Sequence, residues 1–124
     1  MDNLYHGNGV FSYKQSGRFF EGQYVMGERT KGTMRYADGS VYKGQFYHGR
    51  RHGRGSYTFK DGSRYKGDFY KDLMQGIGEL RFRDGSSYVG EWKKGKHEGQ
   101  GSMYSPDGML CWAGMWRDGQ QVLE

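Results

Sequence analysis

The chain has 124 residues, of which 34% are hydrophobic and 17% are aromatic, and it contains 23 glycines against one proline. This composition excludes a conventional thick core and favours repetitive β structure with a thin core of aromatic rings. A net charge of +5 permits acidic partners, anionic membranes or nucleic acid without requiring any of them. The single cysteine, Cys111, excludes an internal disulfide and a thiolate zinc site, and it fits a reducing, cytoplasmic compartment.

A self-similar unit of 22 to 24 residues dominates the sequence, and periods of this size are typical of stacked supersecondary units. Each unit contains the pattern Y-x-G-x-aromatic, as in Tyr65, Gly67 and Phe69, followed by G-x-hydrophobic-x-aromatic. Both patterns alternate with period two, which predicts strands with one apolar face. The predicted divisions are a partial repeat at 6–19, repeats at 20–41, 42–64, 65–87 and 88–110, a partial repeat at 111–119, and a tail at 120–124.

Two kinds of turn alternate along the predicted strands. Asp61-Gly62, Asp84-Gly85 and Asp107-Gly108 are predicted to close tight hairpins, because Asp-Gly tolerates the positive φ that such turns need. The other turns are predicted to be longer and looser, as in residues 49–53. The sequence therefore predicts an all-β, antiparallel meander of about ten strands.

The register between strands can be predicted by matching the apolar faces across both kinds of turn. This places Phe46 between Gly32 and Gly55, and Phe69 between Gly55 and Gly78. Large rings would then cover the glycines of both neighbouring strands, which would offset the weakness of glycine inside a strand.

The pattern Y-x-G-x-[WFY]…H-G-x-G…D-G, repeated every 23 residues, resembles MORN repeats (membrane occupation and recognition nexus) over residues 7–119. Asp72 departs from the family's loop glycine, and Gln75 and Glu98 depart from its loop histidine. The resemblance implies an elongated, twisted, single-layer sheet with a groove along one face. It also implies links to membranes, cytoskeleton or cilia, binding of helical partner segments or acidic phospholipids, and end-to-end dimers in some members.

The apolar face gives the main functional hypothesis, which is a non-catalytic scaffold that binds a helical or extended segment of a protein partner in an aromatic groove. A single-layer sheet has no second layer over its rings, and a contiguous exposed apolar patch marks an interaction site. The alternative is that the groove curls into its own core. The predicted groove residues are Tyr42, Phe46, Phe59, Tyr65, Phe69, Phe82, Tyr88, Trp92 and Trp116.

The second hypothesis is a peripheral membrane module that binds anionic phospholipids through the basic edge formed by the longer loops. Ordinary loop solubility is the alternative explanation of this charge. Nucleic acid is disfavoured, because the basic excess is small and no nucleic-acid-binding fold fits. The residues predicted for this edge are Arg50, Arg51, Arg54, Lys71, Lys93, Lys94 and Lys96.

The sequence predicts no enzyme, cofactor or metal site. His6 and His52 precede strand-opening glycines and are interpreted as turn residues of the repeat. No serine or cysteine has a plausible histidine and acid beside it, and Cys111 is expected to be a packed strand residue. The two terminal strands would present unpaired edges, which predicts either a segment of a longer array or a homodimer.

Overall fold

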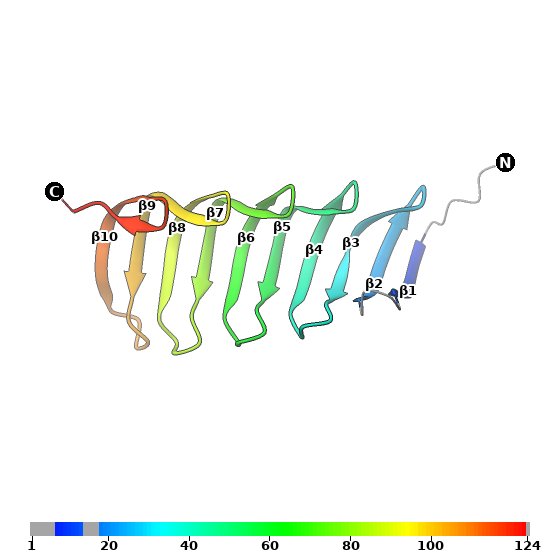
Figure 1. Ribbon diagram of the computed structural model, residues 1–124, viewed down its shortest axis with the longest axis horizontal. Coiled ribbons are helices and arrows are strands. Elements are labelled where there is room, and N and C mark those ends of the chain that lie inside the picture. Colours follow the sequence, from blue (N-terminus) through cyan, green and yellow to red (C-terminus); the bar gives the residue numbers. More distant parts are fainter. Residues whose placement is uncertain (1–6, 14–17, 124) are drawn as a thin grey trace.

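The computed structural model describes residues 7–13 and 18–123, with residues 10–13 described by their backbone, and these residues form one antiparallel sheet without a helix (Figure 1). Eleven strands follow one another across the sheet in chain order. The predicted all-β, single-layer fold is confirmed. The strands are β1 (Gly7–Tyr13), β2 (Arg18–Val25), β3 (Glu28–Arg35), β4 (Val41–Tyr47), β5 (Arg50–Thr58), β6 (Arg64–Tyr70), β7 (Leu73–Arg81), β8 (Ser87–Lys93), β9 (Lys96–Tyr104), β10 (Leu110–Arg117) and β11 (Gln120–Gln121).

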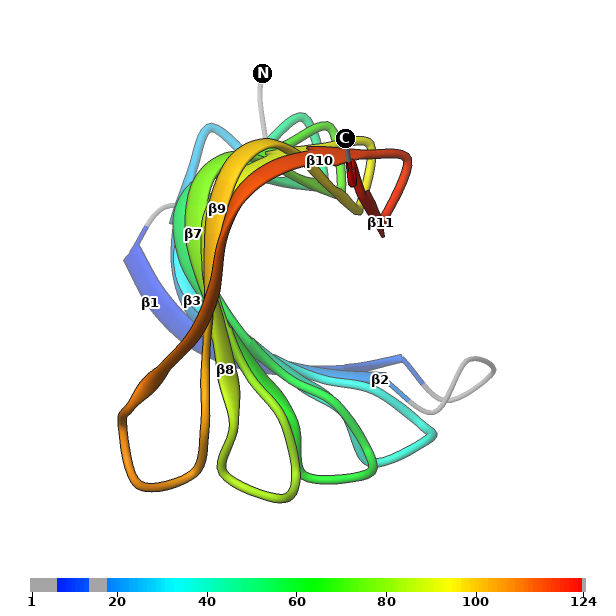
Figure 2. The ribbon, with the colours of Figure 1, turned by 90° about the vertical axis from the view of Figure 1, so that its left-hand side faces the viewer.

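The sheet is elongated and open. Each strand pairs only with its neighbours in the sequence, so β1 and β11 form the two edges. Figure 1 shows the strands side by side along the long axis, and Figure 2, which looks along that axis, shows that the strands bend along their length. The bend gives the sheet a concave face and a convex face. Successive side chains of a strand point to opposite faces, so each unit divides its residues between the two.

The tight turns lie at the edge where long loops were predicted. Each turn has two central residues, and both have positive φ, as in His48 (49°) and Gly49 (78°). This geometry is that of a type I′ turn, whose twist matches the twist of the flanking strands. The strand after the turn therefore begins at Arg50, and the prediction of a loose loop at 49–53 was wrong.

The Asp-Gly turns are the longer ones. In the first of them, the Gly39 N–H donates to the Tyr36 carbonyl at 3.1 Å and the Tyr36 N–H donates to the Ser40 carbonyl at 2.9 Å. Asp38 Oδ1 accepts from the Ser40 N–H at 2.8 Å and from its hydroxyl at 2.6 Å, and only the glycine has a positive φ. The aspartate is thus selected for its carboxylate, which ties the turn to the following serine. The Asp-Gly dipeptide alone does not distinguish this turn from a two-residue hairpin.

The predicted register is wrong by two residues. Gly44 lies opposite Gly32 on one side and Gly55 on the other, and Phe46 lies opposite Arg51 across a bulge. The glycines are covered by the strand-opening tyrosines, because a Cβ atom at Gly55 would lie only 2.6 Å from Tyr42 Cε1. A slip of two residues keeps every side chain on its face, so matching of apolar faces could not detect it.

The core is a single row of aromatic rings that pack against one another on the concave face. Tyr42, Tyr65 and Tyr88 are fully buried, and each packs edge to face with the phenylalanine or tryptophan that precedes the type I′ turn. Ring centroids are 5.0 Å apart for Tyr42 with Phe46 and 5.2 Å apart for Tyr88 with Trp92, a spacing that favours such pairs. Each tyrosine hydroxyl donates to a backbone carbonyl three residues later, at 2.6 to 2.8 Å. The buried hydroxyls are therefore satisfied within their own strands.

Candidate functional site

The predicted groove residues fall into two groups. Seven of them are 0–7% exposed and form the core, namely Tyr42, Phe46, Tyr65, Phe69, Tyr88, Trp92 and Trp116. Phe59 and Phe82 are half-buried and reach solvent. The structure thus places most of the predicted groove in contacts with the chain itself and leaves two of its members accessible.

A stripe of accessible apolar side chains runs beside this core, toward the edge that carries the Asp-Gly turns. Its members are in phase with the buried rings, so they share the concave face. Neighbouring rings touch, with centroids 6.0 Å apart for Tyr36 and Tyr57 and 4.8 Å apart for Tyr57 and Phe59. This concave stripe consists of Tyr36, Tyr57, Phe59, Leu80, Phe82, Met103 and Trp112, all partly buried against the core. The sequence pattern placed these residues on the correct face of the sheet. Only the strand register shows that they form an accessible stripe and are not part of the buried core.

Arg51 lies inside the concave face and not in a loop, because β5 begins directly after the two-residue turn. Its backbone N–H donates to Asp72 Oδ1 at 2.7 Å, its Nε lies 3.2 Å from the same oxygen, and its Nη2 donates to the Asp72 carbonyl at 3.0 Å. Its Cζ lies 4.9 Å from the centroid of Tyr57 and within 6 Å of three further rings. Burial raises the pKa of Tyr36, and the positive charge of Arg51 opposes that rise.

A cavity of about 190 Å³ opens beside Arg51 on the concave face. Its wall combines the Arg51–Asp72 pair with apolar side chains, and it joins the concave stripe through Tyr57 and Phe59. The arrangement offers an apolar surface next to a fixed cation and carboxylate. The lining residues are Arg51, Tyr57, Phe59, Phe69, Asp72, Leu73, Met74 and Gly95.

The position of Arg51 carries an arginine in one other unit and a different residue in the remaining two. Arg29 occupies it in β3, with Cζ 5.6 Å from the centroids of Phe20 and Phe46. Met74 occupies it in β7 and His97 in β9. The concave face therefore carries guanidinium groups near β3 and β5 and side chains of another kind near β7 and β9.

His97 is held by three rings. It stacks on Tyr88 with centroids 3.9 Å apart and planes 4° apart, and it contacts Trp92 and Trp116 edge to face. Its Nδ1 is buried and has no hydrogen-bond partner among the described residues. Burial lowers the pKa of His97, because the ring would lose solvation of its charged form.

The loop histidine of the repeat has a structural partner. His52 Nδ1 accepts from the Lys71 N–H of the next turn at 3.3 Å. The residues that replace it do the same, since Gln75 and Glu98 each accept from the corresponding N–H of the following unit at 3.4 and 3.1 Å. His6 lies outside the described residues. Within residues 7–13 and 18–123, no group of three histidine, cysteine or acidic side chains is placed to hold a metal ion.

The predicted basic edge is partly retained. Arg50, Lys71, Lys93, Lys94 and Lys96 are exposed at or beside the type I′ turns. Arg51 is inside the concave face, and Arg54 is on the convex face, where its Nη1 lies 3.0 Å from Asp68 Oδ1. Placing these two arginines at the edge was wrong, because residues 50–54 belong to a strand. Two exposed tyrosines, Tyr47 and Tyr70, lie beside the remaining cations.

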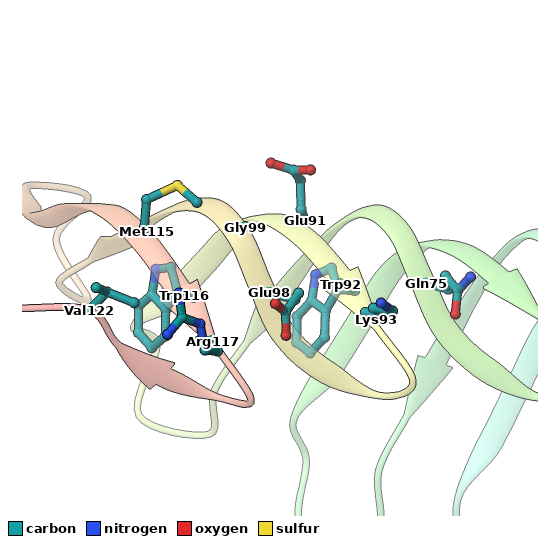
Figure 3. A pocket seen from close by; sticks show the side chains of 10 residues that line it. All are labelled: Gln75, Glu91, Trp92, Lys93, Glu98, Gly99, Met115, Trp116, Arg117 and Val122. Atoms are coloured by element: carbon teal, nitrogen blue, oxygen red, sulfur yellow. The ribbon is translucent and has the colours of Figure 1, made fainter.

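A hollow of about 410 Å³ lies near the C-terminal end of the sheet (Figure 3). Trp92 and Trp116 point to the concave side, whereas Glu91 and Met115 point away from it. Trp92 Nε1 donates to the Gly78 carbonyl at 3.1 Å, while Trp116 Nε1 is buried without a partner in the described chain. The lining contains no serine, threonine, cysteine or histidine. Cys111, which was expected to be packed, is instead exposed next to a bulge in β10.

The structure shows no helix in the described part of the chain, and hence none that could cross a membrane. The family model described as MORN repeat matches residues 1–18, 20–41, 42–64, 65–87 and 88–110. No curated protein matches the chain. MORN repeats are a non-catalytic repeat family found in membrane-related proteins, and they are interaction modules. Five consecutive matches that cover most of the sequence confirm the resemblance seen in the repeat pattern, and the chain belongs to the MORN repeat family.

Proposed function

We propose that this chain is a non-catalytic scaffold that binds an amphipathic segment of a partner protein along the concave stripe. The observation that carries the proposal is the stripe itself, in which Tyr36, Tyr57, Phe59 and Phe82 lie half-buried on a face that no second layer of the described chain covers. Contiguous apolar surface of this kind marks an interaction site. The buried rings beside the stripe hold it in place, so binding of a partner would cost this chain little conformational entropy.

The chemistry of the face favours a particular kind of partner segment. A helix would present apolar residues at every third or fourth position, and an extended segment at every second. Arg29 gives the β3 part of the face a positive charge, and Arg51, paired with Asp72, adds a second guanidinium group in β5, whereas the part around Met74 has neither. The partner segment should therefore carry acidic residues at the end that lies over β3 and β5.

The test compares apolar residues on the two faces. The double variant Phe59→Ser with Phe82→Ser removes two of the accessible rings of the stripe and leaves the fully buried tyrosines in place. The matched control, Ile77→Ser with Val89→Ser, removes two exposed apolar side chains from the convex face. Partners captured from a cell extract with the unmodified chain would be identified, and their binding would be titrated at two salt concentrations after folding is checked.

We expect the stripe variant to weaken binding by about tenfold or more, and the control to change it by less than about twofold. Apolar contacts should also survive high salt, whereas contacts made by exposed charges weaken. A folded stripe variant that binds the partner as well as the unmodified chain does would refute the proposal.

A second candidate function, supported by the exposed basic edge, is binding of anionic phospholipid. Lysines and arginines beside an anionic bilayer each contribute about 1 kcal/mol, and tyrosine side chains such as Tyr47 and Tyr70 suit the headgroup region. Lys93→Glu with Lys94→Glu should then abolish binding to phosphatidylserine vesicles. The stripe variant should leave that binding unchanged, and the reverse pattern would exclude the edge.

Location and oligomeric state follow from these proposals. Either surface would link a partner to a membrane or to the cytoskeleton, including that of a cilium, from the cytoplasmic side. Within the part of the chain that the structure describes, β1 and β11 each have a neighbouring strand on one side only, and such edges also suit a homodimer. Sedimentation at increasing protein concentration tests the dimer, and a species that stays monomeric throughout would exclude it.

A further inference from the structure

A cluster of cations lies on the convex face, away from both surfaces considered so far. The register of β6 and β7 sets Arg64 directly opposite Arg81, and Lys66 opposite Glu79. Arg83, in the turn that follows β7, lines a hollow together with these four side chains. Like charges set directly opposite each other in an antiparallel pair are destabilising. The arrangement therefore needs a reason other than the stability of the sheet.

The hollow between these side chains has a volume of about 450 Å³. Among the described residues, Arg81 makes the one ion pair of the lining, with its Nη2 3.5 Å from Glu79 Oε2, and both side chains of that pair are well exposed. Two further carboxylates lie in the adjoining turns. Hydrogen bonds from Ser63, with a smaller effect of Arg83, hold the pKa of Asp61 below the usual range, and hydrogen bonds from Ser86 do the same for Asp84. The lining residues are Ser56, Gly62, Arg64, Lys66, Glu79, Arg81, Phe82, Arg83 and Gly85.

The other units show that the fold does not require these cations. In the equivalent pair, β8 and β9, Ser87 faces Tyr104 and Val89 faces Ser102, with no charge among them. In β4 and β5, Val41 faces Thr58 and Lys43 faces Ser56. The opposed arginines are thus a local feature of the pair formed by β6 and β7, and the equivalent strand pairs form without them.

We propose that this convex hollow binds a small anion that carries two or more phosphate groups. Guanidinium groups donate paired hydrogen bonds to phosphate oxygens, and Arg64, Arg81 and Arg83 would supply three such groups around one space. Lys66 adds a point charge, and Ser56, opposite Lys66 in β5, adds a hydroxyl donor. The hollow, at about 450 Å³, is larger than a single phosphate group, which is why several phosphates on a compact scaffold fit it. A bound anion would also relieve the repulsion between Arg64 and Arg81.

The first measurement is a calorimetric titration with inositol hexakisphosphate. The double variant Arg64→Ser with Arg81→Thr introduces residues that the chain itself uses at the equivalent positions, Ser87 and Thr58, so its fold should be kept. The control Lys93→Ser with Lys94→Ser removes the same charge from the turn edge. We expect the first variant to weaken binding by at least about tenfold and the control by less than about threefold. Equal losses in the two variants would mean unspecific attraction to a basic protein and would overturn the proposal.

Glu79→Gln provides a test of opposite sign. This change removes the one carboxylate of the lining, so it should tighten binding several-fold, an effect that misfolding cannot imitate. Vesicles that contain phosphatidylinositol 4,5-bisphosphate distinguish a lipid headgroup from a free anion as the source of the phosphates. Binding to either probe that depends on Arg64 and Arg81 supports the site. Absence of binding to both, or vesicle binding that depends only on Lys93 and Lys94, overturns it.

Discussion

Arg51 and His97 occupy the same place in their units, yet the structure uses them in opposite ways. Arg51 pairs with Asp72 of the next unit on the concave face, whereas His97 stacks on Tyr88 with a buried Nδ1 that has no partner in the described chain. Around both, the tyrosines and opposed glycines are arranged alike. The repeat therefore fixes a framework, and the residue between the rings sets the local chemistry.

Asp72 illustrates how a departure from the repeat signals such a site. The second residue of the other type I′ turns is glycine, as in Gly49 and Gly95, and Asp72 takes the same left-handed conformation with φ of 73°. Its carboxylate accepts two bonds from Arg51 and compensates for that conformation. Where His97 replaces the arginine, the following turn has Gly119 at the position of Asp72, and its aspartate, Asp118, stands at the first position of the turn instead.

The largest effect should come from breaking the framework that both units share. Gly55→Ala and Gly101→Ala would each push a Cβ into the ring of the tyrosine above, Tyr42 or Tyr88. We expect each to lower the free energy of unfolding by about 2–3 kcal/mol, because neither ring has room to move. Gly39→Ala is the control, since nothing lies within 4 Å of that position and only its φ of 95° opposes the change, at a cost of about 1 kcal/mol. Urea denaturation measures all three, and a tolerated Gly55→Ala would contradict the register.

The next effect separates the two units, because only one of them contains an ion pair. Arg51→Met would leave Asp72 without its partner, and we expect a loss of about 1–2 kcal/mol. The double variant Arg51→Met with Asp72→Gly copies the chain's own combination of Met74 and Gly95, so it should recover most of that loss. A double-mutant cycle by urea denaturation should give a coupling energy of about 1 kcal/mol or more. Strictly additive losses would show that the pair does not stabilise the fold.

How far the sequence alone could define these features depends on the period of the strands. Alternation with period two assigns each residue to a face, which is why the fold and the shared face of Tyr42, Phe46 and Tyr57 were predicted correctly. It does not fix register, since a shift of two residues leaves the faces unchanged. The tyrosines cover the glycines because of a steric fit between paired strands. The residue pattern of a single strand does not reveal that fit.

The site was harder to predict for a related reason. The sequence prediction took the tight turns for long loops, and it therefore assigned residues 50–54 to a loop and not to a strand. As a result, it placed Arg51 and Arg54 on a surface that they do not occupy. Whether rings on one face pack on each other or stay exposed depends on the curvature of the strands, which composition does not specify. Phe59 and Phe46 follow the same alternation, yet one reaches solvent and the other is buried.

The difference between Arg51 and His97 should also appear as a dependence on pH. The pKa of His97 is lowered in the folded chain, so the unfolded chain binds the proton more readily. Stability should therefore be constant above the ordinary histidine pKa of 6.5 and should fall as the pH decreases below it. His97→Met, which copies Met74, should remove this part of the dependence. The check is the difference in unfolding free energy between the two proteins at pH 7.5 and 5.5, because every other ionisable group is common to both proteins. An equal fall in stability of the two proteins at pH 5.5 would contradict the prediction.

The smallest effect concerns the hydrogen bond that joins consecutive type I′ turns. Each unit compared contains such a hydrogen bond. His52 accepts from the Lys71 N–H, and Gln75 performs the same task one unit later. His52→Gln should thus change the unfolding free energy by less than about 0.5 kcal/mol, whereas His52→Ala should cost about 1 kcal/mol because the N–H loses its acceptor. If the histidine served a ligand instead, glutamine would not replace it in partner or vesicle binding. Equal binding by His52→Gln and the unmodified chain, with a measurable loss of stability in His52→Ala alone, would show that this histidine holds units together.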